Sequence, residues 1–304
     1  MRFSRRSILG SMTALPLSLA APKFALAQLS LGSAKLSTVS DGTLVLPGSF
    51  IFEPMPQDKL SPLLKDMGVS SERLEPECNV TLFQDGQNTV LFDVGSGPDF
   101  MPSAGTLLNS LDAVGVTPED VTHVVFTHAH PDHIWGLLDD FDDPIFTNAT
   151  FMMGRSEWDY WWNPKTVDTI GDARVAFAVG ARRRMEVIED TVELFDDCQE
   201  ILPGIAAFAT NGHTPGHMSF EIRNGTESAL VLGDAIGNHH VAFRRPEWHS
   251  GSDQNAEMAA ATRRRLFERI VGEKMKIVGF HLPNGGIGHA DATNDGFRFI
   301  SEET

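Results

Sequence analysis

The segment THAHPDH, residues 127–133, constrains this chain most, because it sets three histidines and an aspartate directly after an apolar run. Residues 123–127 are typical of a short strand. The first two histidines lie two residues apart and share one face of an extended chain, whereas the aspartate and third histidine follow a proline that favours a helical first turn. These four side chains are His128, His130, Asp132 and His133. They point to two neighbouring places, which suits two adjacent metal ions.

The residue types indicate an open, catalytic metal site. Imidazole nitrogen and carboxylate oxygen are donors for zinc, and also for iron or manganese. Burying four such groups without a metal would leave polar atoms unsatisfied, at about 1 to 3 kcal/mol for each. The only two cysteines, Cys78 and Cys198, are far apart in sequence and give no closely spaced thiolate pair for a closed structural zinc site.

Three further candidate ligands stand where a predicted strand runs into a loop. They are His213 in NGHTPGH, Asp234 in SALVLGDA and His281 after KIVGF. A lone histidine is more often a hydrogen-bonded structural residue than a ligand, so we assign structural or surface roles to His123, His217 and His249.

The distribution of strands and helices predicts an α/β fold. Two Asp-Gly pairs, at 41–42 and 85–86, predict antiparallel hairpins. Helices are predicted over about residues 103–114, 171–190 and 253–269. Each half of the chain mixes strands with helices, which favours layered α/β/β/α packing. No Pro/Ser-rich linker follows residue 35, so we predict a single catalytic domain over residues 28–304.

Residues 1–27 are typical of an export signal. They carry basic residues and no acid, a mildly apolar run, and Ala25-Leu26-Ala27 as a small-x-small cleavage signal. The Arg5-Arg6 pair resembles a twin-arginine signal, which implies a bacterial periplasmic or secreted protein. The apolar run is shorter than the roughly 20 residues of a spanning helix, so no membrane association is expected after cleavage.

The charge of the chain bears on its partners. The formal net charge is −17, which opposes attraction to nucleic acid because phosphate binding requires clustered lysine and arginine. We therefore expect a small-molecule substrate and no nucleic-acid partner.

Together these motifs resemble the five-motif signature of the metallo-β-lactamase superfamily. The matching elements are FDVGSG, THAHPDH, GHTPGH, the Gly233-Asp234 pair and the terminal His281. The similarity extends from about residue 35 to the end of the chain. The leader, the SDGT segment and the closing run HLPNGGIGHADATNDGFRFI most resemble the methyl parathion hydrolase-like branch. The resemblance implies a four-layer αβ/βα sandwich, with two mixed sheets face to face and helices outside.

The resemblance also implies a division of the ligands between two zinc ions. One ion would be bound by His128, His130 and His213, the other by Asp132, His133 and His281, with Asp234 bridging both. Asp93 in FDVGSG matches an acid that orients ligands or braces the turn, and is not counted as a ligand.

Two ions roughly 3.5 to 4 Å apart would hold a bridging hydroxide that attacks a carbonyl or phosphoryl centre. Asp132 would orient this hydroxide and accept its proton. The predicted function is therefore a dinuclear zinc hydrolase of an ester, lactone or phosphotriester, with iron or manganese as alternative metals. No G-x-S-x-G elbow follows a strand, so no serine nucleophile is required.

Substrate-contacting residues are carried over from the related phosphotriester hydrolases, which have an aromatic pocket. The matching positions are Phe100, Trp161 and Phe177, with Trp158 and Trp162 as alternatives for the outward-facing tryptophans. Acyl-homoserine lactonases use a tyrosine three residues after the bridging aspartate, where this chain has Gly237. His239 or His240 could donate a hydrogen bond to a developing oxyanion instead.

Two rival functions remain open. Persulfide dioxygenase-like members share H-x-H-x-D-H but bind a single iron, so metal counting distinguishes them. A non-catalytic periplasmic metal-binding protein would need ligands but no pocket, and the Trp-rich segment between His133 and His213 is better explained as a pocket wall. A homodimer is the default expectation for the oligomeric state.

Overall fold

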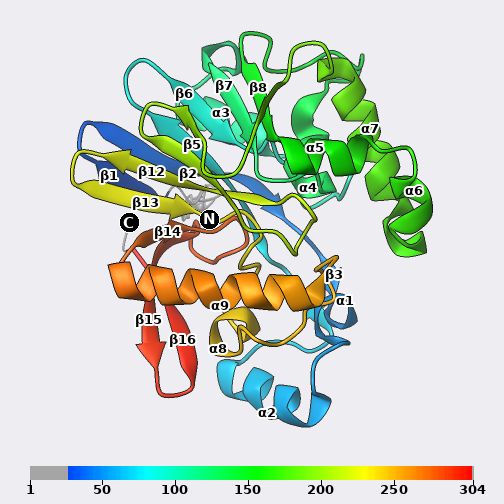
Figure 1. The fold of residues 1–304 in the computed structure, drawn as a ribbon, viewed down its shortest axis with the longest axis vertical. Coiled ribbons are helices and arrows are strands. Elements are labelled where there is room, and N and C mark those ends of the chain that lie inside the picture. The colour runs from blue at the N-terminus through cyan, green and yellow to red at the C-terminus, as the bar shows by residue number, and fades with distance from the viewer. Residues whose placement is uncertain (1–26, 303–304) are drawn as a thin grey trace, which may run out of the picture.

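The computed structural model describes residues 27–302, so the predicted export signal at residues 1–27 lies almost wholly outside the described residues. Two seven-stranded sheets form the centre of the structure (Figure 1). The first contains, in spatial order, β1 (Gln28–Leu31), β2 (Ala34–Thr43), β5 (Glu77–Gln84), β6 (Thr89–Phe92), β7 (His123–Phe126), β8 (Thr150–Gly154) and β9 (Glu193–Phe195). The second contains β10 (Glu200–Leu202), β11 (Ile205–Ala209), β12 (Met218–Asn224), β13 (Glu227–Val231), β14 (Lys276–Val278), β15 (Ile287–Thr293) and β16 (Gly296–Ser301).

Both sheets are mixed. Strands β6 to β9 run parallel to one another, as do β13 and β14, and the other pairings are antiparallel. A further two-stranded sheet joins β3 (Leu46–Pro47) to β4 (Arg73–Leu74). The helices are α1 (Gly48–Phe52), α2 (Gln57–Met67), α3 (Leu107–Ala113), α4 (Pro131–Ile134), α5 (Arg155–Trp162), α6 (Thr166–Thr169), α7 (Val175–Ile188), α8 (Val241–Arg244) and α9 (Ala256–Glu273), and short 3-10 turns cover 118–120, 135–137 and 172–174.

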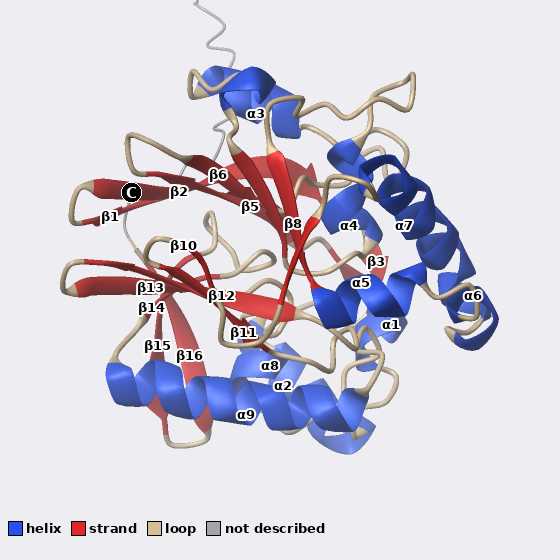
Figure 2. Cartoon of the chain, turned by 45° about the horizontal axis from the view of Figure 1, so that its top comes forward, coloured by secondary structure: helices blue, strands red, loops and turns tan. Residues whose placement is uncertain are grey.

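Apolar side chains fill three layers between these elements. Phe92 and Val125 of the first sheet meet Phe220 and Val231 of the second, which defines the core between the sheets. Figure 2 shows α3, α4 and α7 on the outer side of the first sheet and α9 on the outer side of the second. Separate buried clusters lie beneath these two sets of helices. The predicted four-layer αβ/βα sandwich is therefore confirmed.

The two predicted hairpins had different outcomes. The pair at 85–86 does form the turn between the antiparallel strands β5 and β6. The pair at 41–42 does not, which corrects the prediction: β2 continues through it to Thr43, with a register shift between Ser40 and Thr43. Gly42 has the positive φ of 96° that an Asp-Gly pair predicts. This conformation forms a β-bulge in β2 rather than a chain reversal.

The predicted helices are present with shorter or shifted bounds, as α3, α7 and α9. None of the helices in the described part of the chain is long and apolar enough to cross a lipid bilayer.

Candidate metal centre

The structure brings all seven predicted ligands together at one end of the two sheets. Each follows a strand or opens a short helix: two after β7, two in α4, and one each after β11, β13 and β14. The carboxyl ends of the parallel neighbours β13 and β14 meet at one edge of the second sheet. The face-to-face packing of the two sheets brings the loop after β7, in the first sheet, to the same place. All seven side chains are buried, at 0 to 8 % exposure. Their assignment as ligands stays a prediction.

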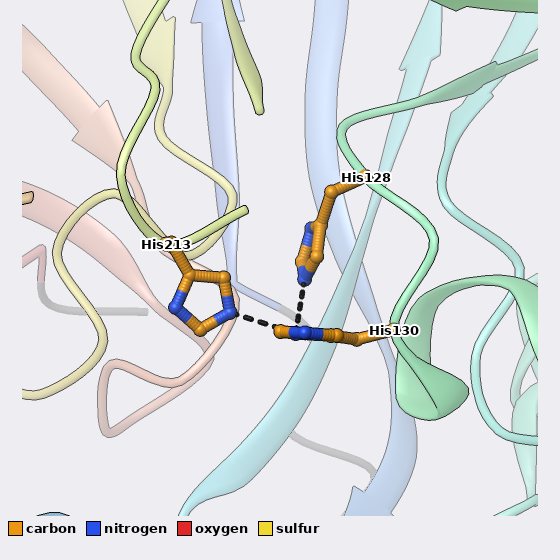
Figure 3. A group of neighbouring side chains, drawn as sticks. All are labelled: His128, His130 and His213. Carbon is orange, nitrogen blue, oxygen red and sulfur yellow. Dashed lines mark hydrogen bonds between the residues drawn. The ribbon is translucent and has the colours of Figure 1, made fainter. Parts of the chain in front are cut away.

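The first cluster consists of His128, His130 and His213. Nε2 of His128 lies 3.1 Å from Nδ1 of His130, and Nε2 of His213 lies 2.9 Å from that same atom (Figure 3). Three imidazole nitrogens therefore converge on one point, each from a different direction. Each of these nitrogens in a neutral ring is either an N–H donor or a lone-pair acceptor, so three of them at one point cannot all be paired with one another. A single cation would instead accept a lone pair from each nitrogen.

The second cluster consists of Asp132, His133 and His281, and Asp234 joins it to the first. Nε2 of His281 lies 3.2 Å from Oδ2 of Asp132 and 3.3 Å from Oδ2 of Asp234. Oδ1 of Asp234 lies 3.4 Å from Nε2 of His133, and Oδ2 lies 3.3 Å from Nε2 of His213. The two oxygens of Asp234 thus face both clusters, as a bridging carboxylate requires.

Unsatisfied atoms show that this donor set fits metal ions. Oδ2 of Asp132, Nε2 of His133 and Oδ1 of Asp234 are buried and have no hydrogen-bond partner within residues 27–302. A buried polar atom without a partner costs about 1 to 3 kcal/mol, and here three of them face a common space. Two divalent cations would satisfy them, with imidazole and carboxylate donors of the kind that zinc prefers.

The protonation states of the histidines differ between the first and the second cluster. Burial holds the pKa of His128 and of His130 well below the ordinary value, so both rings are in the neutral form that binds a metal. Burial also opposes charge on His133 and His281, but the carboxylates of Asp132 and Asp234 outweigh it and raise both pKa values well above the ordinary value. The second cluster therefore compensates its carboxylates with positive charge, a role that a bound cation would take over.

Asp93 occupies the position expected of an acid that orients a ligand. Its carboxylate accepts hydrogen bonds of 2.8 Å from the backbone N and from Oγ1 of Thr127, and lies 2.8 Å from Nδ1 of His133. With a bound cation in place of the positive charge of the ring, Nδ1 of His133 would keep its proton for Asp93 and Nε2 would be free to bind the metal.

A cavity of about 510 Å³ opens onto the clusters. Its floor includes His130, Asp132, His213, Asp234 and His281. Its walls are largely apolar and come from the segments around α1, β3 and β4, including Leu44, Leu46, Phe50, Ile51, Val69 and Leu74. Phe100 and Phe177 also line it, with ring centroids 6.1 Å apart in an edge-to-face arrangement. Two of the three predicted substrate-contacting residues therefore line the cavity, and their contact with a substrate stays a prediction.

Trp161 does not line the cavity, which corrects its assignment as a substrate-contacting residue. Its side chain is 1 % exposed, its ring lies edge-on behind His130, and its Nε1 donates a 2.6 Å hydrogen bond to Glu157. The two alternatives, Trp158 and Trp162, are stacked on one another and are likewise absent from the cavity wall. Helix α5 packs its aromatic residues against the core, so this helix supports the site from behind.

Several residues near the centre gave no sequence signal. Asp41 is fully buried and accepts hydrogen bonds from the backbone N and Oγ of Ser96 and from the backbone N of Leu107. These hydrogen bonds fix the loop that follows Asp93. The sequence did not predict this role of Asp41, because its Asp-Gly pair was interpreted as a turn. His217, expected to be structural, accepts a 3.0 Å hydrogen bond from the backbone N of Asp234. Glu157, Asp253 and Gln254 also contact the histidines of the first cluster or the loops that carry them.

His239 and His240 both line the cavity, on the wall that follows Gly237. Burial lowers the pKa of His240 to about 3, so this ring is neutral over the physiological range. A neutral imidazole can still donate one hydrogen bond to a ligand.

Comparison with known proteins identifies the relatives of this chain. The family model described as Metallo-beta-lactamase superfamily matches residues 75–271. An N-acyl homoserine lactonase of a Bacillus species is 23 % identical over 253 residues, which cover 80 % of this chain and 87 % of that protein. The N-acyl homoserine lactonase AttM of Agrobacterium fabrum is 29 % identical over 135 residues, 41 % of this chain and 44 % of that protein.

Two solved structures share nearly the whole fold. AidC, a dizinc quorum-quenching lactonase solved in complex with a product, superposes with a TM-score of 0.86 at 24 % identity, covering 92 % of this chain and 98 % of that chain. The hydrolase AbOPH superposes with a TM-score of 0.84 at 26 % identity, with the same coverage of 92 % and 98 %.

Proposed function

The chain belongs to the metallo-β-lactamase superfamily, and from that membership we propose that it is a dinuclear-metal hydrolase of a neutral, largely apolar ester or lactone. The comparisons confirm the expectation of a metal-dependent hydrolase. One observation carries the proposal: two clusters of buried donors, joined by Asp234, form the floor of an apolar cavity. Two divalent ions bound there would supply Lewis acidity and a strongly nucleophilic water at neutral pH.

The chain's own residues would place the substrate and move a proton. The apolar wall around Phe50, Ile51 and Phe177 favours burial of an uncharged substituent of the substrate. Asp132 reaches the cavity floor and would accept the proton of the attacking water. The only tyrosine, Tyr160, is not among the residues that line the cavity, so His239 or His240 would donate the hydrogen bond to the developing oxyanion.

The names of the relatives support an ester or lactone as the first substrate class. The Bacillus and Agrobacterium proteins are named as N-acyl homoserine lactonases, and AidC as a quorum-quenching lactonase. A phosphotriester is the second class, because the aromatic wall of Phe100 and Phe177 would also accept a neutral aryl ester of phosphate.

Metal analysis combined with a substrate panel tests the proposal. The protein expressed from Gln28 should contain about two zinc ions per chain and hydrolyse members of an ester, lactone and phosphotriester panel. About one iron per chain would instead support the persulfide dioxygenase-like alternative. Two bound metals with no turnover of any panel member would support a metal-binding protein without catalysis.

Asp132→Asn should lower kcat by roughly 100-fold, because an amide still offers an oxygen ligand but cannot accept the proton. Steady-state kinetics on the best panel substrate, alongside metal content, measure this effect. Asp140→Asn provides the control, since Asp140 is an exposed aspartate a short distance along the chain from the same motif. Full turnover by a fully metallated Asp132→Asn protein would rule out the proton-accepting role.

A further inference from the structure

Asp253 and Gln254 contact two histidines of the first cluster from outside it. Oδ1 of Asp253 lies 3.2 Å from Nδ1 of His213, and Nε2 of Gln254 lies 3.2 Å from Nε2 of His130. These two residues, here called the orienting pair, immediately precede the N-cap of α9. They lie about 40 and 124 residues along the chain from the histidines they contact.

The identity of the contacted nitrogens gives these contacts a chemical meaning. His213 presents Nε2 to the convergence point of the first cluster, and His130 presents Nδ1 to it. A neutral ring that binds a metal through one nitrogen must carry its proton on the other. Asp253 therefore accepts the Nδ1 proton of His213. Gln254 would accept the Nε2 proton of His130 through its amide oxygen, since the oxygen and nitrogen of a side-chain amide exchange places by a half-turn.

The orienting pair is itself rigidly held. Oδ2 of Asp253 accepts a 2.7 Å hydrogen bond from Arg263 of α9, and both side chains of this ion pair are buried. Arg263 also donates to the backbone oxygens of Pro246 and Trp248. The backbone N of Gln254 donates to the backbone oxygen of His213 at 3.0 Å. Helix α9 and the loop that carries His213 are therefore one connected unit.

We propose that Asp253 and Gln254 are positioning residues that fix the tautomers and ring directions of His213 and His130, and thereby set the metal affinity of the first cluster but not of the second. The inference rests on the proposed two-metal function. Asp93 has the equivalent role for the second cluster, because it holds Nδ1 of His133 directly. It reaches the first cluster only through Thr127, whose Oγ1 donates to Asp93 and lies 2.9 Å from Nδ1 of His128. Nothing in the sequence motifs marks the orienting pair.

A single-site background separates the two clusters experimentally. His281→Ala removes a donor of the second cluster, so that zinc binding reports on the first. In this background, Asp253→Asn and Gln254→Leu should each weaken zinc affinity about 10- to 100-fold, as measured by competition with a chromogenic chelator. In Asp253→Asn the single oxygen would accept from Arg263, so that an NH2 group would face Nδ1 of His213 and no acceptor would remain for its proton. Gln254→Glu keeps an acceptor oxygen and should preserve the affinity. The matched control is Glu257→Gln, an exposed carboxylate in the first turn of α9, which should leave the affinity within about twofold.

The outcomes distinguish the inference from the proposed function. Wild-type protein with fewer than about two metals per chain would contradict the proposed function. Wild-type protein with two metals, together with Asp253→Asn and Gln254→Leu affinities within twofold of the His281→Ala background, would overturn the inference. Gln254→Leu leaves the Asp253–Arg263 ion pair intact, so its result stands even where Asp253→Asn impairs folding. Equal weakening by Gln254→Glu and Gln254→Leu would also overturn the assigned role of the amide oxygen.

Discussion

Replacing Asp234 with asparagine should lower kcat/KM by at least about 1000-fold and reduce the bound metal below two ions per chain. Both oxygens of Asp234 face imidazole nitrogens, Oδ1 toward His133 and Oδ2 toward His213 and His281. An asparagine offers one oxygen and turns an NH2 group toward the other cluster, where a cation would repel it. A 1000-fold loss corresponds to about 4 kcal/mol of transition-state stabilisation. Metal content and steady-state kinetics on the same preparation measure both effects.

The fold of the Asp234→Asn protein can be checked independently. The backbone N of Asp234 donates to His217, and this contact does not depend on the replaced side chain. Far-UV circular dichroism of the variant should therefore match that of the wild type. A variant that keeps two metals and activity within tenfold of wild type would refute the bridging assignment.

Replacing Glu157 with leucine should destabilise the protein by roughly 4 kcal/mol or more. Its carboxylate is fully buried and accepts four hydrogen bonds: from the backbone N of Ala129 and of Gly216 at 3.0 Å, from Trp161 Nε1 at 2.6 Å and from Thr214 Oγ1 at 2.7 Å. Leucine leaves these four donors buried without an acceptor, at about 1 to 3 kcal/mol each before local relaxation.

The same change should also disturb the metal centre, because Glu157 joins its two histidine loops. Ala129 lies between His128 and His130, and Thr214 directly follows His213. Without the carboxylate, the two loops lose the shared hydrogen-bond acceptor that holds them together. We expect the first cluster to lose metal before the second.

Denaturant unfolding of the metal-free and metal-loaded proteins measures the stability effect. Glu157→Gln should give an intermediate loss of about 1 to 3 kcal/mol, since one oxygen remains and one NH2 group faces a backbone donor. Asp159→Asn is the matched control on the exposed face of α5. A Glu157→Leu protein as stable as that control would contradict the role given to this carboxylate.

The sequence was sufficient to predict the fold class and the side chains that gather at one site, whereas their assignment as metal ligands stays a prediction. Strands that end in histidine or aspartate place these side chains at one edge of a sheet, and their spacing in THAHPDH divides them between two directions. These are local features, set by the period of an extended chain and by one proline. The structure finds the seven side chains together and the four-layer sandwich as expected.

Local signals failed where a residue's surroundings come from remote segments. An Asp-Gly pair predicts a turn, yet Asp41 lies inside a strand because Ser96 and Leu107 supply its hydrogen bonds. The tryptophans of α5 resemble a pocket wall in composition, yet Trp161 faces inward because Glu157 accepts its indole proton. Ser96 and Leu107 lie 55 and 66 residues from Asp41, so sequence spacing does not identify them. Glu157 lies one helical turn before Trp161, but its buried position is set by the remote Ala129, Thr214 and Gly216.

The sequence by itself determined which chemical groups can bind metal and, through the family resemblance, the class of reaction. Only the tertiary structure decided which nitrogen of each ring faces the centre, what orients it, and which apolar residues form the cavity. The reason is physical: ligand identity is a property of single residues and of local periodicity. Orientation is set by hydrogen bonds such as that of Asp253 to His213, between residues 40 positions apart that only the packing of α9 brings together.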